Sequence, residues 1–99
     1  MTYTLKTQYA TYENCHLSRN SYCDNGRIYL ELWNEEDGPI AVLTVNIPGC
    51  SMEKNETALD TNNLPTVTQF VEENGIGEFT GRYARSGYCT YPIYKIKEA

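Results

Sequence analysis

Positively charged and aromatic side chains come together once in this sequence, in the stretch "TGRYARSGYCTYPIY" at residues 80 to 94. Arg82 and Arg85 lie there close to Tyr83 and Tyr88. A guanidinium beside an aromatic ring can bind a phosphate or stack on a base. It can equally form salt bridges with carboxylates, which are numerous in this chain. These four residues are the candidate binding site, and the pattern leaves open whether the arginines bind a ligand or form internal ion pairs.

A cysteine–histidine pair is the second chemistry to consider. His16 is the single histidine and directly follows Cys15. Neighbouring residues on a strand point to opposite faces, so Cys15 is a poor partner for it, whereas Cys89 is geometrically open. The four cysteines, which include Cys23 and Cys50, contain no C-x-x-C pair and match no zinc module. We therefore expect small buried cysteines and predict no catalytic residue, no metal and no cofactor, so that the protein is not an enzyme.

The charge and length of the chain limit its partners. The 99 residues include 8 basic and 13 acidic side chains, for a formal net charge of −5. A general nucleic-acid binder usually carries the opposite sign, so nucleic acid is not expected as a general ligand. The sequence has no apolar run near the roughly 20 residues of a membrane span and no signal-peptide pattern, which predicts a cytoplasmic protein without a membrane. This length predicts a single domain over residues 1–99.

Tyrosine is the unusual feature of the composition, with nine tyrosines against two phenylalanines. A tyrosine ring packs like other aromatics, but its hydroxyl needs a partner, so many of these rings should lie at the rim of the core. Exposed tyrosines are common in protein interfaces. The alternative is that tyrosine is frequent here because it suits β-strands.

The first half of the chain reads as antiparallel sheet. Asn25-Gly26 is a strong signal for a hairpin with a type I′ turn. The run "RIYLELW" that follows alternates with period 2, so that Ile28, Leu30 and Leu32 face one way. These three residues should form part of the core.

A second hairpin is predicted at Asp37-Gly38, between "RIYLELW" and "AVLTVNI". A loop of two or four residues there gives cross-strand pairs whose residue numbers sum to 75. The expected pairs are Ile28 with Ile47, Leu30 with Val45, and Leu32 with Leu43. All six side chains are aliphatic and would lie on one face of the sheet.

One short helix is expected near residues 65–74. Pro65 suits its first turn, Asn62 or Asn63 could cap it, and Gly75 stands where a left-handed terminator belongs. Its apolar stripe consists of Val67, Phe70 and Val71. The glycines of "GIGEFTGR" should let the chain turn between this helix and a closing strand, in which Tyr94 and Ile96 point inward. The fold class is therefore α+β, an antiparallel sheet of about five strands in a hairpin meander with one short helix packed on one face.

The C-terminal part, "LDTNNLP…FVEENGIGEFTGRYARSGYCTYPIY", resembles an uncharacterised domain-of-unknown-function family of small bacterial proteins. The resemblance covers roughly residues 43 to 94 and is strongest in "DTNN", "ENGIG", "TGR" and "SGYCTYP". It implies a phage or conjugative-element setting and brings no catalytic residue with it. Small acidic proteins of such elements frequently bind and block a host factor.

The sequence therefore predicts a non-catalytic, acidic protein-binding module of a mobile genetic element. We expect it to inhibit a host defence complex, as anti-CRISPR or anti-restriction proteins do, and to have a protein partner. The first alternative is a nucleic-acid-associated protein that uses the C-terminal arginine and tyrosine patch. The second alternative is a small cysteine-dependent enzyme that uses Cys89.

Overall fold

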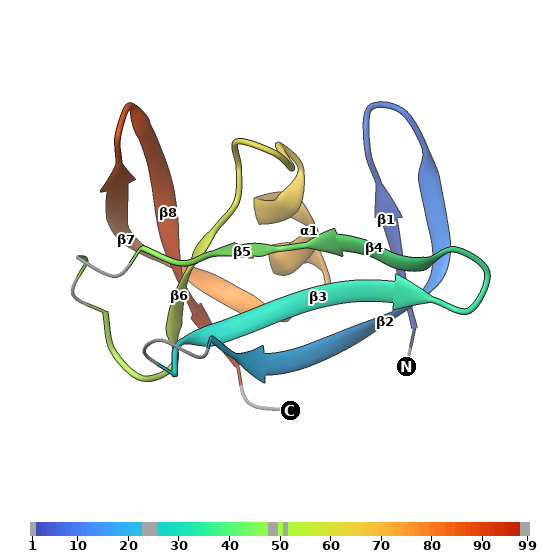
Figure 1. The fold of residues 1–99 in the computed structure, drawn as a ribbon, viewed down its shortest axis with the longest axis horizontal. Coiled ribbons are helices and arrows are strands. Elements are labelled where there is room, and N and C mark those ends of the chain that lie inside the picture. Colours follow the sequence, from blue (N-terminus) through green and yellow to red (C-terminus); the bar gives the residue numbers. More distant parts are fainter. Residues whose placement is uncertain (1, 23–25, 48–49, 51, 98–99) are drawn as a thin grey trace.

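The strands form two antiparallel sheets with one short helix beside them (Figure 1). The computed structural model describes residues 2–22, 26–47, 50 and 52–97. The first sheet has the order β1-β2-β3-β4, and the second has the order β5-β6-β8-β7. The elements are β1 (Tyr3–Lys6), β2 (Thr11–Ser21), β3 (Ile28–Asn34), β4 (Gly38–Val42), β5 (Thr44–Val45), β6 (Glu56–Leu59), α1 (Val67–Glu73), β7 (Gly77–Ser86) and β8 (Cys89–Ile96).

The hairpin of β2 and β3 is confirmed, and the inner face of β3 is as predicted. Ile28, Leu30 and Leu32 are all buried, because their alternation directs them into the core. The Tyr22 backbone N–H donates to the Arg27 carbonyl at 2.8 Å and closes the hairpin. The type I′ turn was predicted at Asn25-Gly26, and Asn25 lies outside the described residues.

The hairpin of β3 and β4 exists, but its predicted register is wrong. Leu32 pairs with Ala41 instead of Leu43, and Asn34 pairs with Gly38 across a three-residue loop. The Asn34 side chain causes this closure, since its Oδ1 accepts the Asp37 N–H at 2.6 Å while Gly38 has a φ of 73°. The three-residue loop, together with a bulge between Leu32 and Trp33, shifts the pairing by two residues from the predicted register.

The predicted single sheet of about five strands is also wrong, because the chain changes sheets at Leu43. The Leu43 N–H still donates to the Leu30 carbonyl of the first sheet at 2.8 Å. The next residue, Thr44, already pairs with Leu59 of the second sheet. The run "AVLTVNI" is therefore two short strands in two sheets.

Helix α1 is shorter than expected but is terminated as predicted. The backbone N–H groups of Gly75 and Ile76 bond the carbonyls of Glu72 and Val71, and Gly75 has a φ of 65°. This is a Schellman motif, which favours glycine at that place. The predicted Asn62 or Asn63 cap is wrong, because Thr66 occupies the N-cap and no side chain caps the helix. The expected apolar stripe is confirmed as buried and consists of Val67, Phe70 and Val71.

The stretch "GIGEFTGR", residues 75–82, was expected to turn the chain between the helix and a closing strand, and this expectation is wrong from Gly77 onward. Residues 77–86 form the ten-residue strand β7, which pairs with β8. Gly81, with a φ of 86°, lies where the register shifts between Phe79 and Tyr83. The glycine therefore serves a bulge within a strand rather than a connection before one. Tyr94 and Ile96 are buried in β8, as predicted.

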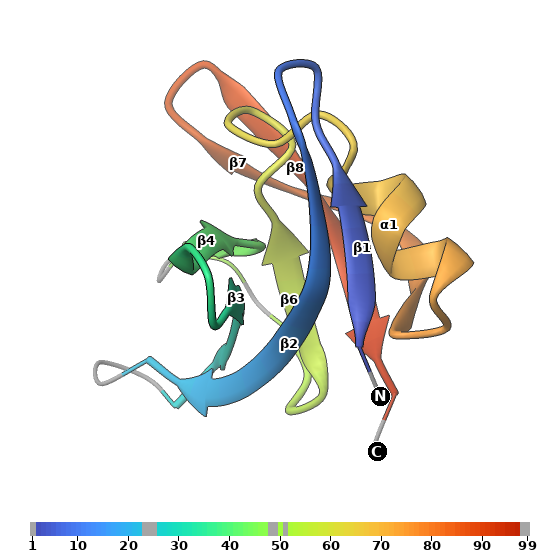
Figure 2. The same ribbon diagram turned by 90° about the vertical axis from the view of Figure 1, so that its right-hand side faces the viewer.

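Two groups of buried side chains hold this arrangement together. The larger joins both sheets and α1, and the smaller lies on the other face of the second sheet. Figure 2 shows α1 beside β1, with the β1–β2 and β7–β8 hairpins extending to the same side of the molecule. The larger group includes Leu5, Leu30, Leu32, Leu43, Leu59, Val67, Val71 and Ile96, and the smaller consists of Ile47, Ala58, Ala84, Tyr91 and Ile93.

We expect Leu43→Ala to lower the free energy of unfolding by about 2–5 kcal/mol, because it leaves a cavity where the sheets meet. Chemical denaturation measures the change. The neighbouring Val42 is 37% exposed, so Val42→Ala is the matched control and should cost much less. Equal losses in the two variants would contradict the role given to Leu43.

Candidate functional site on the β7–β8 hairpin

The β7–β8 hairpin ends in a two-residue turn that leaves Tyr88 in solvent. Ser86 pairs with Cys89, so Gly87 and Tyr88 form the turn, and Gly87 has a φ of 61°. A positive φ at the first of two turn residues is typical of a type II′ hairpin turn, where glycine is favoured. Tyr88 is 107% exposed relative to a reference tyrosine. Its ring therefore contributes nothing to the core.

Arg82 is paired inside the protein. Its guanidinium forms a salt bridge with the carboxylate of Glu56 in β6, and Glu56 is buried while about half of the Arg82 side chain is exposed. Glu56 also accepts the Glu53 backbone N–H at 2.9 Å. The hydrogen bond from Arg82, followed by the bond from Glu53, holds the pKa of Glu56 below its usual range. Arg82 thus neutralises the buried Glu56 carboxylate, which would destabilise the fold if it had no partner.

Tyr83 belongs to a row of aromatic rings along the hairpin. It contacts Phe79 edge to face, with ring centroids 5.4 Å apart, and Phe79 in turn contacts Tyr94 at 5.5 Å. Tyr83 and Phe79 are exposed, whereas Tyr94 is buried and donates to Glu72 at 3.1 Å. Burial, together with this hydrogen bond to Glu72, raises the pKa of Tyr94 to about 12. The row therefore runs from the core to the surface.

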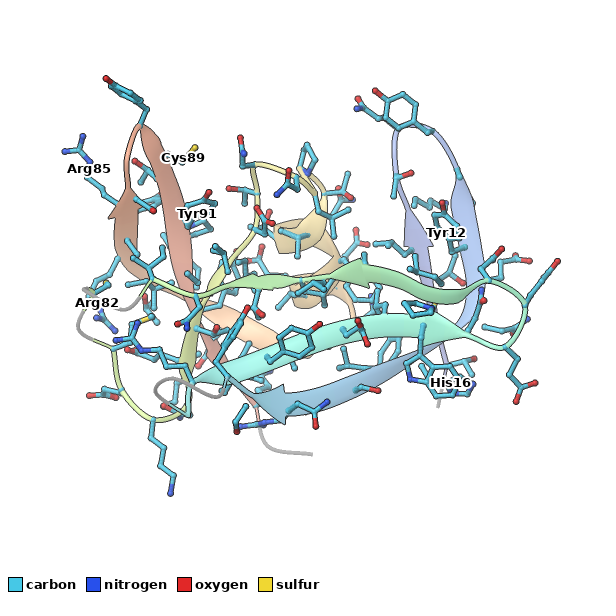
Figure 3. All side chains as sticks on the ribbon, viewed as in Figure 1. Tyr12, His16, Arg82, Arg85, Cys89 and Tyr91 are labelled. Carbon is cyan, nitrogen blue, oxygen red and sulfur yellow. The ribbon has the colours of Figure 1, made fainter. Side chains whose placement is uncertain are left out.

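Arg85 extends into solvent near the tip of the hairpin (Figure 3). It lies two residues after Tyr83, on the same face of β7, since side chains alternate along a strand. No ion pair to Arg85 is found among the described residues. Residues 79–94 contain two arginines and no aspartate or glutamate, so this hairpin is locally positive in an acidic chain.

The four predicted site residues have different surroundings in the structure. Tyr83 and Arg85 share an exposed face of β7 and Tyr88 lies at the nearby tip, whereas Arg82 is committed to Glu56. Phe79 joins the exposed aromatic row and was missed by the sequence reading. The bulge at residues 80–82 brings Phe79 next to Tyr83. In a regular strand the two residues would share a face but lie about 13 Å apart.

The cysteine–histidine pair considered in the sequence does not assemble. His16 stacks on Trp33 of the first sheet at 4.5 Å, whereas Cys89 lies on the β7–β8 hairpin beside Tyr91 (Figure 3). A hydrogen bond with Cys89 raises the pKa of Tyr91. Cys15 is buried, as expected, and burial raises the pKa of its thiol. Cys50 and Cys89 are only half-buried.

No group of three or more histidine, cysteine, aspartate or glutamate side chains is placed to hold a metal ion in the part of the chain that the structure covers. No helix in that part is long and apolar enough to cross a membrane.

A family model matches residues 16–99, from β2 to the C-terminus, and thus includes the whole β7–β8 hairpin. The chain belongs to the DUF4313 family. Its description is a domain of unknown function, which agrees with the predicted resemblance to an uncharacterised family. The DUF4313 match also includes the second half of β2 and all of β3 and β4. No curated protein and no solved structure matches the chain.

The Arg82–Glu56 pair should make the free energy of unfolding depend on pH. The folded-state pKa of Glu56 lies below that of a free glutamate, so its contribution is complete above the unfolded pKa of about 4.3 and is lost as the pH falls through the folded pKa. Replacing Glu56 by glutamine should flatten this acid-side loss. The measurement is the free energy of unfolding between pH 7 and pH 3.

The exposed Glu78 on β7, the strand of Arg82, supplies the matched variant, Glu78→Gln, which should keep the acid-side loss of the unmodified protein. An unchanged pH profile in Glu56→Gln would show that the pair contributes nothing to stability.

Proposed function

We propose that this DUF4313 protein is a non-catalytic protein-binding module of a mobile genetic element, and that it inhibits a host defence complex of the anti-CRISPR or anti-restriction type. The observation that carries the proposal is Tyr88, a fully exposed ring at the tip of a tight hairpin, with exposed Arg85 and Tyr83 beside it. Tyrosine and arginine are the side chains most often responsible for binding energy in protein interfaces.

Charge supports a partner with an acidic docking surface. Residues 79–94 of the hairpin contain two arginines and no aspartate or glutamate, although the whole chain has a formal charge of −5. Complementary charge speeds association and selects among partners. The similarity of the C-terminal motifs to small proteins of phages and conjugative elements supports the mobile-element setting.

The nucleic-acid alternative has less support than the arginine and tyrosine pattern first suggested. Arg82 neutralises Glu56, which leaves Arg85 as the hairpin arginine without an ion pair among the described residues. Affinity for a nucleic acid depends on the number of phosphates that are neutralised. The cysteine-enzyme alternative loses its proposed base, since His16 and Cys89 lie on different sheets.

We expect Tyr88→Ala to weaken the complex with the host partner by about 30-fold or more, which corresponds to roughly 2 kcal/mol at an interface hot spot. The protein is first purified from its native host at near-native expression to recover a stoichiometric partner. Affinity is then measured with the purified partner. A phage or plasmid that encodes the same variant should no longer be protected in a host that carries the intact defence system.

The conservative variant Tyr88→Phe keeps the ring and should retain most of the affinity. Arg85→Ala should weaken binding more than Arg19→Ala, a matched loss of an exposed arginine on β2. Recovery of no stoichiometric partner, or salt-dependent binding of single-stranded oligonucleotides that needs Arg85, would overturn the proposal.

A further inference from the structure

A second surface lies away from the β7–β8 hairpin. A cleft of about 410 Å³ opens between the β1–β2 hairpin, β4 and the segment before α1. Leu5, Tyr12 and Leu64 contribute to its walls, and Ile40 and Val42 of β4 form one side. None of the residues that line it carries a charge, although a fifth of the chain is charged. A charged ligand would lose its hydration in this cleft without gaining an ion pair.

One side of the cleft is the unpaired edge of a sheet. Strand β4 is the last strand of the first sheet, so no other strand of the described residues pairs with its outer edge. The Leu43 N–H donates to Leu30, which makes Leu30 and Leu43 a hydrogen-bonded pair. Pairs alternate along an antiparallel ladder, so Val42, opposite Glu31, is in a non-hydrogen-bonded position. The backbone N–H and C=O of Val42 therefore point away from β3, toward the cleft.

The available edge is short, because the chain blocks it on both sides. Pro39 has no N–H, and a bulge shifts the register between Leu32 and Trp33 beside it. After Val42, the Leu43 carbonyl already accepts the Asp60 N–H at 2.9 Å. An incoming strand can thus pair with β4 around Val42 and no further.

We propose that this cleft binds a short, uncharged, extended segment of a partner protein, which adds as a strand to β4 and places an apolar side chain between the β1–β2 hairpin and Leu64. Backbone hydrogen bonds to Val42 supply the pairing, and the uncharged walls select the side chain. The site shares no residue with the β7–β8 hairpin, so its test is independent of the function proposed for that hairpin.

The test uses a capped five-residue peptide, acetyl-Ser-Val-Thr-Val-Ser-amide, titrated into the full chain and followed by the backbone amide resonances. The Val42 amide should shift together with those of other cleft residues. A peptide with an N-methyl group on its central residue has lost one strand hydrogen bond and should bind at least about tenfold more weakly. Equal binding of the two peptides, shifts located elsewhere, or no shift at millimolar peptide would overturn the proposal.

Val42→Pro tests the same bond from the protein side. Proline is tolerated on an edge strand where the N–H faces outward, so this change removes the donor that the peptide needs. We expect it to weaken binding by about tenfold, whereas Val42→Thr keeps the N–H and should bind normally. If the Val42→Pro variant does not fold, the comparison of the two peptides is sufficient to test the proposal. If the same resonances shift with protein concentration in the absence of peptide, the cleft binds a second copy of the chain, and the proposal is overturned.

Discussion

The two sheets depend on the passage of the chain through Leu43. Its N–H bonds Leu30 in the first sheet, its carbonyl accepts the Asp60 N–H, and its side chain is fully buried in the larger core. A second link lies nearby, where the hydroxyl of Thr57 in β6 donates to the Ile28 carbonyl at 3.1 Å. Each sheet has four strands, and such a sheet is stable in water only when its hydrophobic face is covered. The shared core is therefore what allows the hairpins to extend as far as they do.

Local patterns predicted the parts of this fold that depend on neighbours in sequence. The alternation of Ile28, Leu30 and Leu32, the glycine terminator at Gly75 and the stripe on α1 each follow from a spacing of two to four residues. The register of β4 was not predictable in this way. It depends on how the Asn34 side chain closes a three-residue loop and on the bulge between Leu32 and Trp33, and each of these shifts every pair that follows.

The candidate site shows the same limit of sequence reading. The pattern identified Arg82, Tyr83, Arg85 and Tyr88 as a group, and their proximity along one hairpin agrees with that grouping. Their separate roles depend on contacts between residues distant in sequence, since Glu56 lies 26 residues before Arg82. The high tyrosine content likewise indicated exposed rings without saying which. Tyr91 and Tyr94 are buried, whereas Tyr9, Tyr83 and Tyr88 are exposed.

The positions of these exposed rings bear on how a partner could be held. Tyr9 and Tyr88 lie on hairpins that extend to the same side of the molecule, with the loop before α1 between them (Figures 1 and 2). The cleft beside β4 opens between that loop and the β1–β2 hairpin. Two weak contacts on one rigid scaffold reinforce one another, because the first to form raises the effective concentration for the second. A partner that met both the β7–β8 hairpin and the cleft would therefore bind more tightly than either surface alone allows, while each surface remained separable by mutation.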